Sequence, residues 1–209
     1  MWVLMNNLKK AVALLVVVGS LGGASRTQAQ SPADGGADGF FASLSGLCGK
    51  AFAGKIVTNE PTPAAADPFE GKALVFHLRR CEKDRLELPF HVGDDRSRTW
   101  VLTRKDGEVS LKHEHRHKDG SPDPLTMYGG LTAKPGTAVR QEFPADPETK
   151  ALFTKLNLPV SIPNVWAMEV ETGKRFVYEL ARPGRRFRVE FDLTKPVDPP
   201  PAPWGHESK

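Results

Sequence analysis

Between residues 72 and 194 the chain alternates between apolar and polar positions, which is the pattern of β-strands with one buried face. Turn sequences separate these short runs; one is KDGE at residues 105–108, where Asp-Gly favours a tight hairpin. One apolar face per strand indicates antiparallel pairing. The pattern predicts eight or nine strands, the clearest over residues 72–80, 85–90, 97–104, 108–117, 137–143, 164–170, 174–180 and 186–193.

Two further segments have helical periodicity. Apolar side chains recur at three- and four-residue steps between Phe40 and Phe52, which predicts a short amphipathic helix. Residues 144–157 contain Asp146 as a plausible N-cap and Pro147 at the first helical position. We therefore expect a mainly β fold: an antiparallel up-and-down barrel or cup of the lipocalin kind, with a short N-terminal helix and one helix inserted late in the meander. A β-sandwich is the alternative.

The N-terminus has the features of an export signal. Lys9 and Lys10 precede an apolar run, and small residues favour cleavage after Ala29. We expect a signal peptide over residues 1–29, a flexible leader over 30–39, a β-barrel domain over 40–194 and a Pro-rich tail over 195–209. The protein would then be secreted or periplasmic. No second apolar stretch is long enough to span a bilayer, so we expect no stable membrane insertion after cleavage.

Export changes how the charges and cysteines are interpreted. The net charge is +4, and removal of Lys9, Lys10 and Arg26 leaves +1, so we expect no nucleic-acid partner. The basic cluster near residues 182–188 alternates with core-facing aromatics, which favours a salt-bridged outer face. The two cysteines, Cys48 and Cys81, are expected to form a disulfide in an oxidising compartment.

Three histidines, His113, His115 and His117, occupy alternate positions on one predicted strand. They continue its apolar face, so they should point inward near one end of the barrel. Alternate residues lie about 6.6 Å apart along a strand. Two neighbouring imidazoles can therefore share a divalent metal such as zinc, with a third ligand from another strand or from the loop at residues 118–123. The alternatives are an acid/base centre and a hydrogen-bonded polar barrel end.

Three other polar residues are candidates for ligand binding. Arg98 lies on the same face of its predicted strand as the apolar residues, so it should point inward. Its guanidinium could hold a carboxylate or phosphate, or it could brace the turn with Asp95. Tyr128 lies in a predicted loop beside Gly129-Gly130, a pair that indicates unusual dihedrals or close backbone approach. Gln141 lies on a core face, where its amide must find a partner.

Several motifs together resemble a group of uncharacterised secreted bacterial proteins: FHVGDDRSRTWVL, LKHEHRHKDG, TMYGG, NVWAMEV and FRVEFDL. The resemblance covers nearly all of the mature domain and implies no activity, cofactor or substrate. Our leading hypothesis is an exported barrel that binds a small-molecule ligand or a metal ion at one mouth through the histidine row. A metal- or histidine-dependent enzyme at the same site is the first alternative. A structural envelope protein without a small-molecule site is the second.

Overall fold

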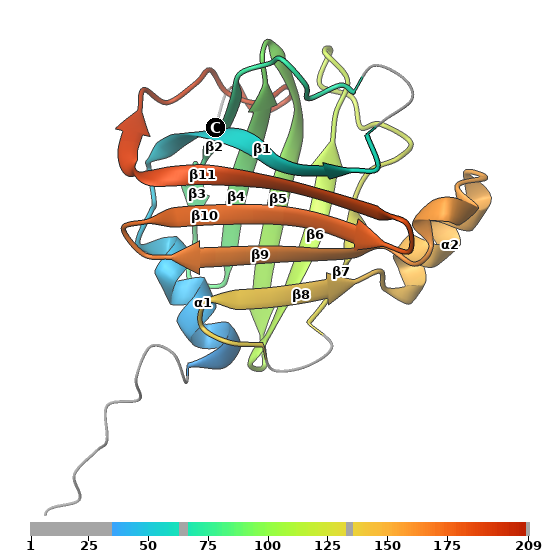
Figure 1. Ribbon diagram of the computed structural model, residues 1–209, viewed down its shortest axis with the longest axis horizontal. Coiled ribbons are helices and arrows are strands. Elements are labelled where there is room, and N and C mark those ends of the chain that lie inside the picture. Colours follow the sequence, from blue (N-terminus) through green and yellow to red (C-terminus); the bar gives the residue numbers. More distant parts are fainter. Residues whose placement is uncertain (1–34, 63–66, 133–135, 208–209) are drawn as a thin grey trace, which may run out of the picture.

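The computed structural model describes residues 35–62, 67–132 and 136–207, so the predicted signal peptide lies outside the described residues. The strands form one antiparallel sheet that curls into a nearly closed barrel (Figure 1). The strands are β1 (Ala51–Glu60), β2 (Leu74–His77), β3 (Arg80–Cys81), β4 (Arg85–Val92), β5 (Asp95–Lys105), β6 (Glu108–His115), β7 (Tyr128–Leu131), β8 (Arg140–Pro144), β9 (Val165–Glu171), β10 (Arg175–Arg182) and β11 (Arg185–Val197). The helices are α1 (Gly36–Ser45), α2 (Pro147–Lys155) and the 3-10 turn η2 (Pro159–Ser161).

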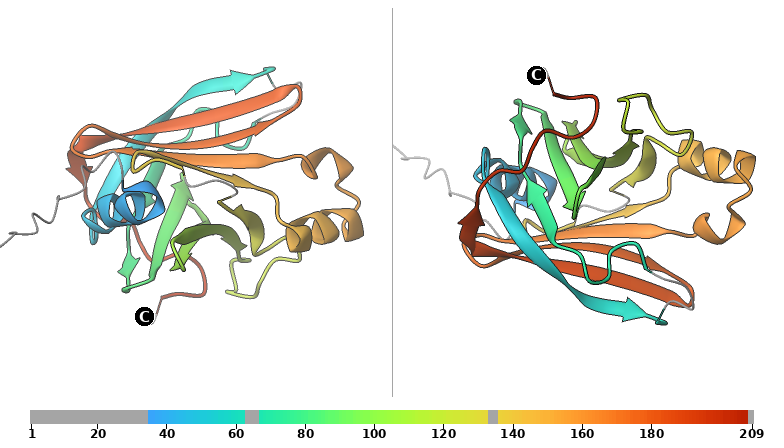
Figure 2. Two further views of the ribbon diagram at one scale, coloured as in Figure 1. Left: turned by 90° about the horizontal axis from the view of Figure 1, so that it is seen from below. Right: turned by 90° about the horizontal axis from the view of Figure 1, so that it is seen from above.

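The strand order confirms the predicted up-and-down meander. Around the barrel the strands run β7-β6-β5-β4-β2-β1-β11-β10-β9-β8, and β3 pairs only with β4. The ladder between β1 and β11 joins the two ends of the meander, from Ala51 opposite Val197 to Glu60 opposite Arg186. In Figure 1, β1 and β8 to β11 cross in front of β4, β5 and β6, and Figure 2 shows these two groups edge-on. The long β1–β11 ladder distinguishes this barrel from a sandwich.

The seam of the barrel lies between β7 and β8. It is held by a bridge between Gly130 and Ala145 and by a hydrogen bond from Asp146 N–H to the Gly129 carbonyl, at 3.0 Å. A Cβ atom at Gly130 would lie 1.8 Å from the Pro144 carbonyl oxygen, so only glycine fits. The predicted close approach at Gly129-Gly130 is confirmed. The segment is a strand, however, and not the loop that we expected.

Apolar side chains fill most of the interior, and α1 covers one end of the barrel (Figure 2). Phe40, Phe41 and Leu44 of α1 are at most 2% exposed. The Arg104 guanidinium lies 4.8 Å from the centroid of the Phe41 ring and pairs with Asp38 of the same helix, which secures α1 against the strands. The other end of the barrel is therefore the end that is available for a site.

The N-terminal boundary differs from the prediction in two ways. Helix α1 begins at Gly36, inside the expected leader, and ends at Ser45, whereas Phe52 belongs to β1. Strand β1 was not predicted because Gly54 interrupts its apolar alternation. The Phe191 ring fills the space at Gly54, where a Cβ atom would lie 2.4 Å from Phe191 Cδ1.

The Pro-rich C-terminal residues pack against the barrel. After Val197, residues 198–207 contain no helix or strand, yet they lie along the outer side of β5 and β6, and we name them the C-terminal strap. Arg96 Nη1 donates to the Ala202 carbonyl at 2.9 Å, and Trp204 N–H donates to the Arg96 carbonyl at 3.1 Å. His206 Nε2 lies 2.9 Å from Glu114 Oε2. The expected extended tail is thus a strap held by defined contacts.

The predicted disulfide between Cys48 and Cys81 is present, with a Cα–Cα distance of 6.2 Å. It ties the turn that follows α1 to β3. No helix in the described part of the chain is both long enough and apolar enough to cross a membrane.

The salt-bridged outer face expected on β11 is also present. Arg188 donates to Glu169 on β9 and to Glu179 on β10, at 2.7 and 3.0 Å. Burial opposes ionisation of Glu179, but hydrogen bonds from three arginines outweigh it and lower its pKa to about 2. This face is a paired network on the outside of the barrel, which agrees with the solvated strand that the sequence predicts.

Candidate functional site

The open mouth of the barrel is bordered by rows of inward side chains that become more polar toward the end. On β5 and β6, Arg98 lies opposite His115 in the register. One level deeper, His113 of β6 lies opposite both Trp100 of β5 and Tyr128 of β7. The predicted inward direction of His113 and His115 therefore agrees with the structure.

His113 is held by hydrogen bonds at both ring nitrogens. Nδ1 lies 3.1 Å from the Tyr128 carbonyl oxygen and Nε2 lies 2.8 Å from the Tyr178 hydroxyl. Because a carbonyl can only accept, Nδ1 carries the proton and Nε2 accepts from the hydroxyl. Burial, and next the neighbouring His115, lower the pKa of His113 to about 3. His113 is thus neutral at pH 7, and neither nitrogen is free.

His115 lies nearer the mouth and contacts the Tyr128 hydroxyl, at 3.2 Å from its Nε2. Burial, and next the charge of Arg98, lower the pKa of His115 to about 4. Burial raises the pKa of Tyr128 to about 12. Both groups are uncharged at neutral pH, and they form a neutral hydrogen-bonding pair on the wall.

His117 does not continue the inward row. It lies beyond the end of β6, its side chain is 52% exposed, and its Nε2 is 3.8 Å from Asp123 Oδ2. Within the described residues, no group of three His, Cys, Asp or Glu side chains is placed to hold a metal ion. The geometry therefore does not support the predicted metal site, in which two neighbouring histidines of the row and a third ligand share one ion: the strand ends before His117, and hydrogen bonds engage both nitrogens of His113.

Arg98 lines a cavity of about 180 Å³ beside the histidines. Its guanidinium pairs with Asp95 and lies 5.3 Å from the centroid of the Phe69 ring. Arg98 therefore braces the turn, which is one of its two predicted roles, and it also faces the mouth, whereas anion binding by Arg98 stays a prediction. The walls of this cavity are mainly aromatic: Phe69, Phe90, Arg98, Thr99, Trp100, His113, His115, Tyr128 and Tyr178.

A second cavity of about 240 Å³ adjoins the first. The two share Phe69, Tyr128 and Tyr178 as walls, and together they enclose about 420 Å³ (180 and 240 Å³). Sites for small ligands commonly enclose about 300–1,000 Å³. The second cavity adds mostly apolar residues from α2, η2, the β-strands and the segments that connect them: Leu125, Phe153, Leu158, Ser161, Asn164, Trp166, Leu180, Arg182, Arg185 and Phe187.

Gln141 does not belong to this site. Its Nε2 donates to the Thr137 carbonyl at 2.7 Å, and it lines neither cavity. Sequence reasoning missed Phe69 and Arg182, which do line the site. A signal existed for Arg182, because it has the same parity as the inward residues Tyr178 and Leu180 of β10. Phe69 comes from the connection between β1 and β2, where no strand or helix pattern predicts a direction.

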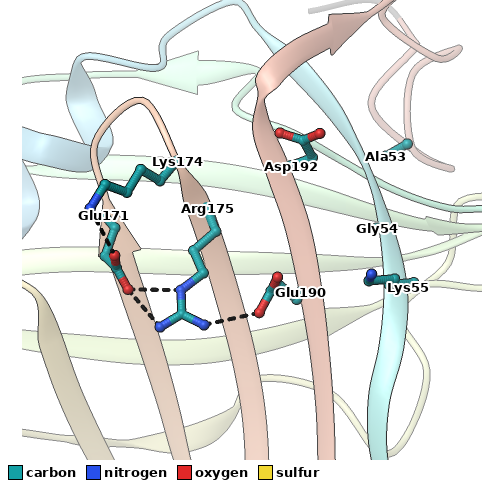
Figure 3. A pocket seen from close by; sticks show the side chains of 8 residues that line it. All are labelled: Ala53, Gly54, Lys55, Glu171, Lys174, Arg175, Glu190 and Asp192. Atoms are coloured by element: carbon teal, nitrogen blue, oxygen red, sulfur yellow. Dashed lines mark hydrogen bonds and ion pairs between the residues drawn. The ribbon is translucent and has the colours of Figure 1, made fainter.

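A broader hollow of about 530 Å³ lies on the outer face, over β1, β9, β10 and β11 (Figure 3). Four of its charged groups pair with one another: Arg175 contacts Glu171 and Glu190, and Lys174 contacts Glu171. Paired charges on an open face offer a ligand little beyond what water offers. The mouth cavities are the better candidate site.

Comparisons of this chain with protein-family profiles, curated proteins and solved structures give no significant match. The resemblance to secreted bacterial proteins therefore stays a prediction. A barrel fold by itself does not define a function, which depends on the chemistry of the residues at the mouth.

Proposed function

We propose that this protein is an exported β-barrel that binds a small, largely apolar molecule at its open mouth. The observation that carries the proposal is the pair of adjoining cavities with shared aromatic walls. Small β-barrels use such a mouth or interior to hold one ligand. Export rests on the N-terminal signal pattern, and the Cys48–Cys81 disulfide agrees with an oxidising compartment.

The polar groups at the mouth would orient the ligand. The Arg98 guanidinium has donors beyond the nitrogen that pairs with Asp95, and the Tyr128 hydroxyl and the His115 ring border the same cavity. A few placed polar groups in an apolar cavity fix the orientation of a ligand, while the apolar walls supply most of the affinity.

The geometry favours binding over the alternatives that use the same residues. A general base works best with a pKa near the working pH, whereas the pKa of His115 is about 4. A metal ligand needs a free nitrogen, and both nitrogens of His113 are engaged. A purely structural barrel would gain stability from a filled interior, because unfilled volume costs packing energy.

A titration with the neutral fluorophore N-phenyl-1-naphthylamine tests the proposal. We expect saturable binding of one molecule, with enhanced fluorescence of the probe. Leu125→Trp places an indole into the second cavity, so we expect it to weaken binding by about tenfold or more.

Leu131→Trp is the matched control, because Leu131 is 42% exposed and lines neither cavity. It introduces the same side chain and should retain wild-type affinity. Absence of saturable binding to the wild-type protein, or equal weakening by both substitutions, would contradict the proposed site.

A further inference from the structure

The mouth carries positive charge where the inward-facing side chains of several strands end. Arg98 ends the inward row at the start of β5, and Arg182 and Arg185 occupy the corresponding inward positions of the hairpin between β10 and β11. Of the residues that line the two cavities, these three arginines carry the fixed charges, and no carboxylate is among them. The lining is therefore apolar with a cationic rim.

The three arginines differ in their partners. Arg98 pairs with Asp95. Arg185 donates to the Glu60 and Arg186 carbonyls, and its Nη2 lies 4.0 Å from Asp67 Oδ2. These two guanidinium groups already have acceptors, so neither needs a ligand.

In the part of the chain that the structure describes, Arg182 has fewer hydrogen-bond acceptors around its guanidinium than Arg185, and it lacks the carboxylate partner that Arg98 has. Its Nη1 donates to Asn164 Oδ1 at 3.2 Å, and among the described residues no carboxylate lies within 4.0 Å of its guanidinium. Arg188, on the outer face of β11, contacts two glutamates by contrast. Burial, and next the charge of Arg185, lower the pKa of Arg182, which means that its positive charge is disfavoured in this position.

An anion beside Arg182 would stabilise the positive charge of its guanidinium. The guanidinium presents a planar fork of N–H donors that matches a carboxylate, and Nε and Nη2 have no acceptor among the described residues. Leu158, Leu180 and Phe187 line the same cavity and would contact an apolar chain attached to that carboxylate.

We propose that the mouth selects a hydrophobic monocarboxylate, with its carboxylate on Arg182 and its apolar body in the adjoining cavities. This inference rests on the ligand-binding function proposed above and adds the chemical class of the ligand. A single charge fits because Arg182 is the rim cation without a carboxylate partner. The apolar body fits because the rest of the lining is mostly aromatic and aliphatic.

Displacement of N-phenyl-1-naphthylamine by decanoate and by 1-decanol tests the head group, since the two compounds share the same chain length. We expect decanoate to compete about tenfold or more better than decanol against the wild-type protein. Arg182→Met keeps an apolar stem and removes the charge, so the two compounds should then compete equally. Arg182→Lys keeps the charge and should retain most of the preference.

Arg186→Met is the matched control on the outer face, where Arg186 pairs with Glu179 and lines neither cavity. It should retain the wild-type preference. Equal competition by decanoate and decanol against the wild-type protein overturns the inference and leaves the proposed function intact. A preference that is lost in Arg98→Met and kept in Arg182→Met also overturns it. Failure of the probe to bind at all removes the proposed function and the inference with it.

Discussion

At the scale of single residues, burial determines the state of the inward histidines. Parity along β6 correctly predicts the direction of His113 and His115, because alternation is a local property. Their protonation is not predictable in this way, since it depends on Tyr178, which lies 65 residues further along the chain. His117 shows the limit of parity, because the pattern continues in the sequence after the strand has ended.

The lowered histidine pKa values predict how stability depends on pH. His91, which is buried on β4, and His115 have pKa values of about 4, and His113 of about 3, against about 6.5 in an unfolded chain. Between the folded and the unfolded pKa values, these histidines bind protons in the unfolded chain but not in the folded protein. The stabilisation that they contribute is therefore complete above about pH 6.5 and falls as the pH is lowered. Each histidine contributes up to about 1.4 kcal/mol per pH unit in that window.

Urea unfolding between pH 7 and pH 5 measures this slope. Carboxylates act mainly at lower pH, since their ordinary pKa values lie near 4. His115→Gln should flatten the slope by up to one histidine's contribution, whereas His117→Gln, at an exposed position, should leave it unchanged. A free energy of unfolding that stays constant from pH 7 to pH 5 would be inconsistent with neutral buried histidines.

At the scale of elements, local patterns predicted most strands and missed those that depend on glycine. Strand β1 is concealed by Gly54, against which Phe191 packs, and β7 by Gly129 and Gly130. Glycine normally weakens a strand, so a sequence pattern treats it as a break. Here the glycines allow close packing, and the need for them comes from residues far away in the chain.

The seam offers a direct test of this role. Gly130→Ala should open the seam, because the new Cβ atom would lie 1.8 Å from the Pro144 carbonyl oxygen. We expect a loss of at least about 2 kcal/mol in the free energy of unfolding, together with faster hydrogen exchange at the Asp146 amide, which donates to Gly129. Gly46→Ala is the control, since its Cβ atom would make an ordinary 3.4 Å contact. Equal stability of the two variants would argue against a close-packed seam.

At the scale of the whole molecule, the site depends on contacts that no local pattern encodes. The ladder between β1 and β11 pairs residues more than 125 positions apart, and it decides that the sheet becomes a barrel. The cavities then combine Phe69 from one connection, Leu125 from another, and inward residues of β5, β6, β9, β10 and β11. Sequence analysis could therefore place Arg98, His115 and Tyr128 near a mouth, but it could not describe the cavity that they border.

The central claim is that the mouth of the barrel binds the ligand, and the indole N–H signals of Trp100, Trp166 and Trp204 test it in one spectrum. Trp100 and Trp166 line the two mouth cavities, and Trp204 lies in the C-terminal strap beside a separate hollow. On titration with N-phenyl-1-naphthylamine, the Trp100 and Trp166 signals should shift saturably while that of Trp204 stays constant. A shift of Trp204 alone, or no shift of Trp100 and Trp166 at saturation, would contradict binding at the mouth.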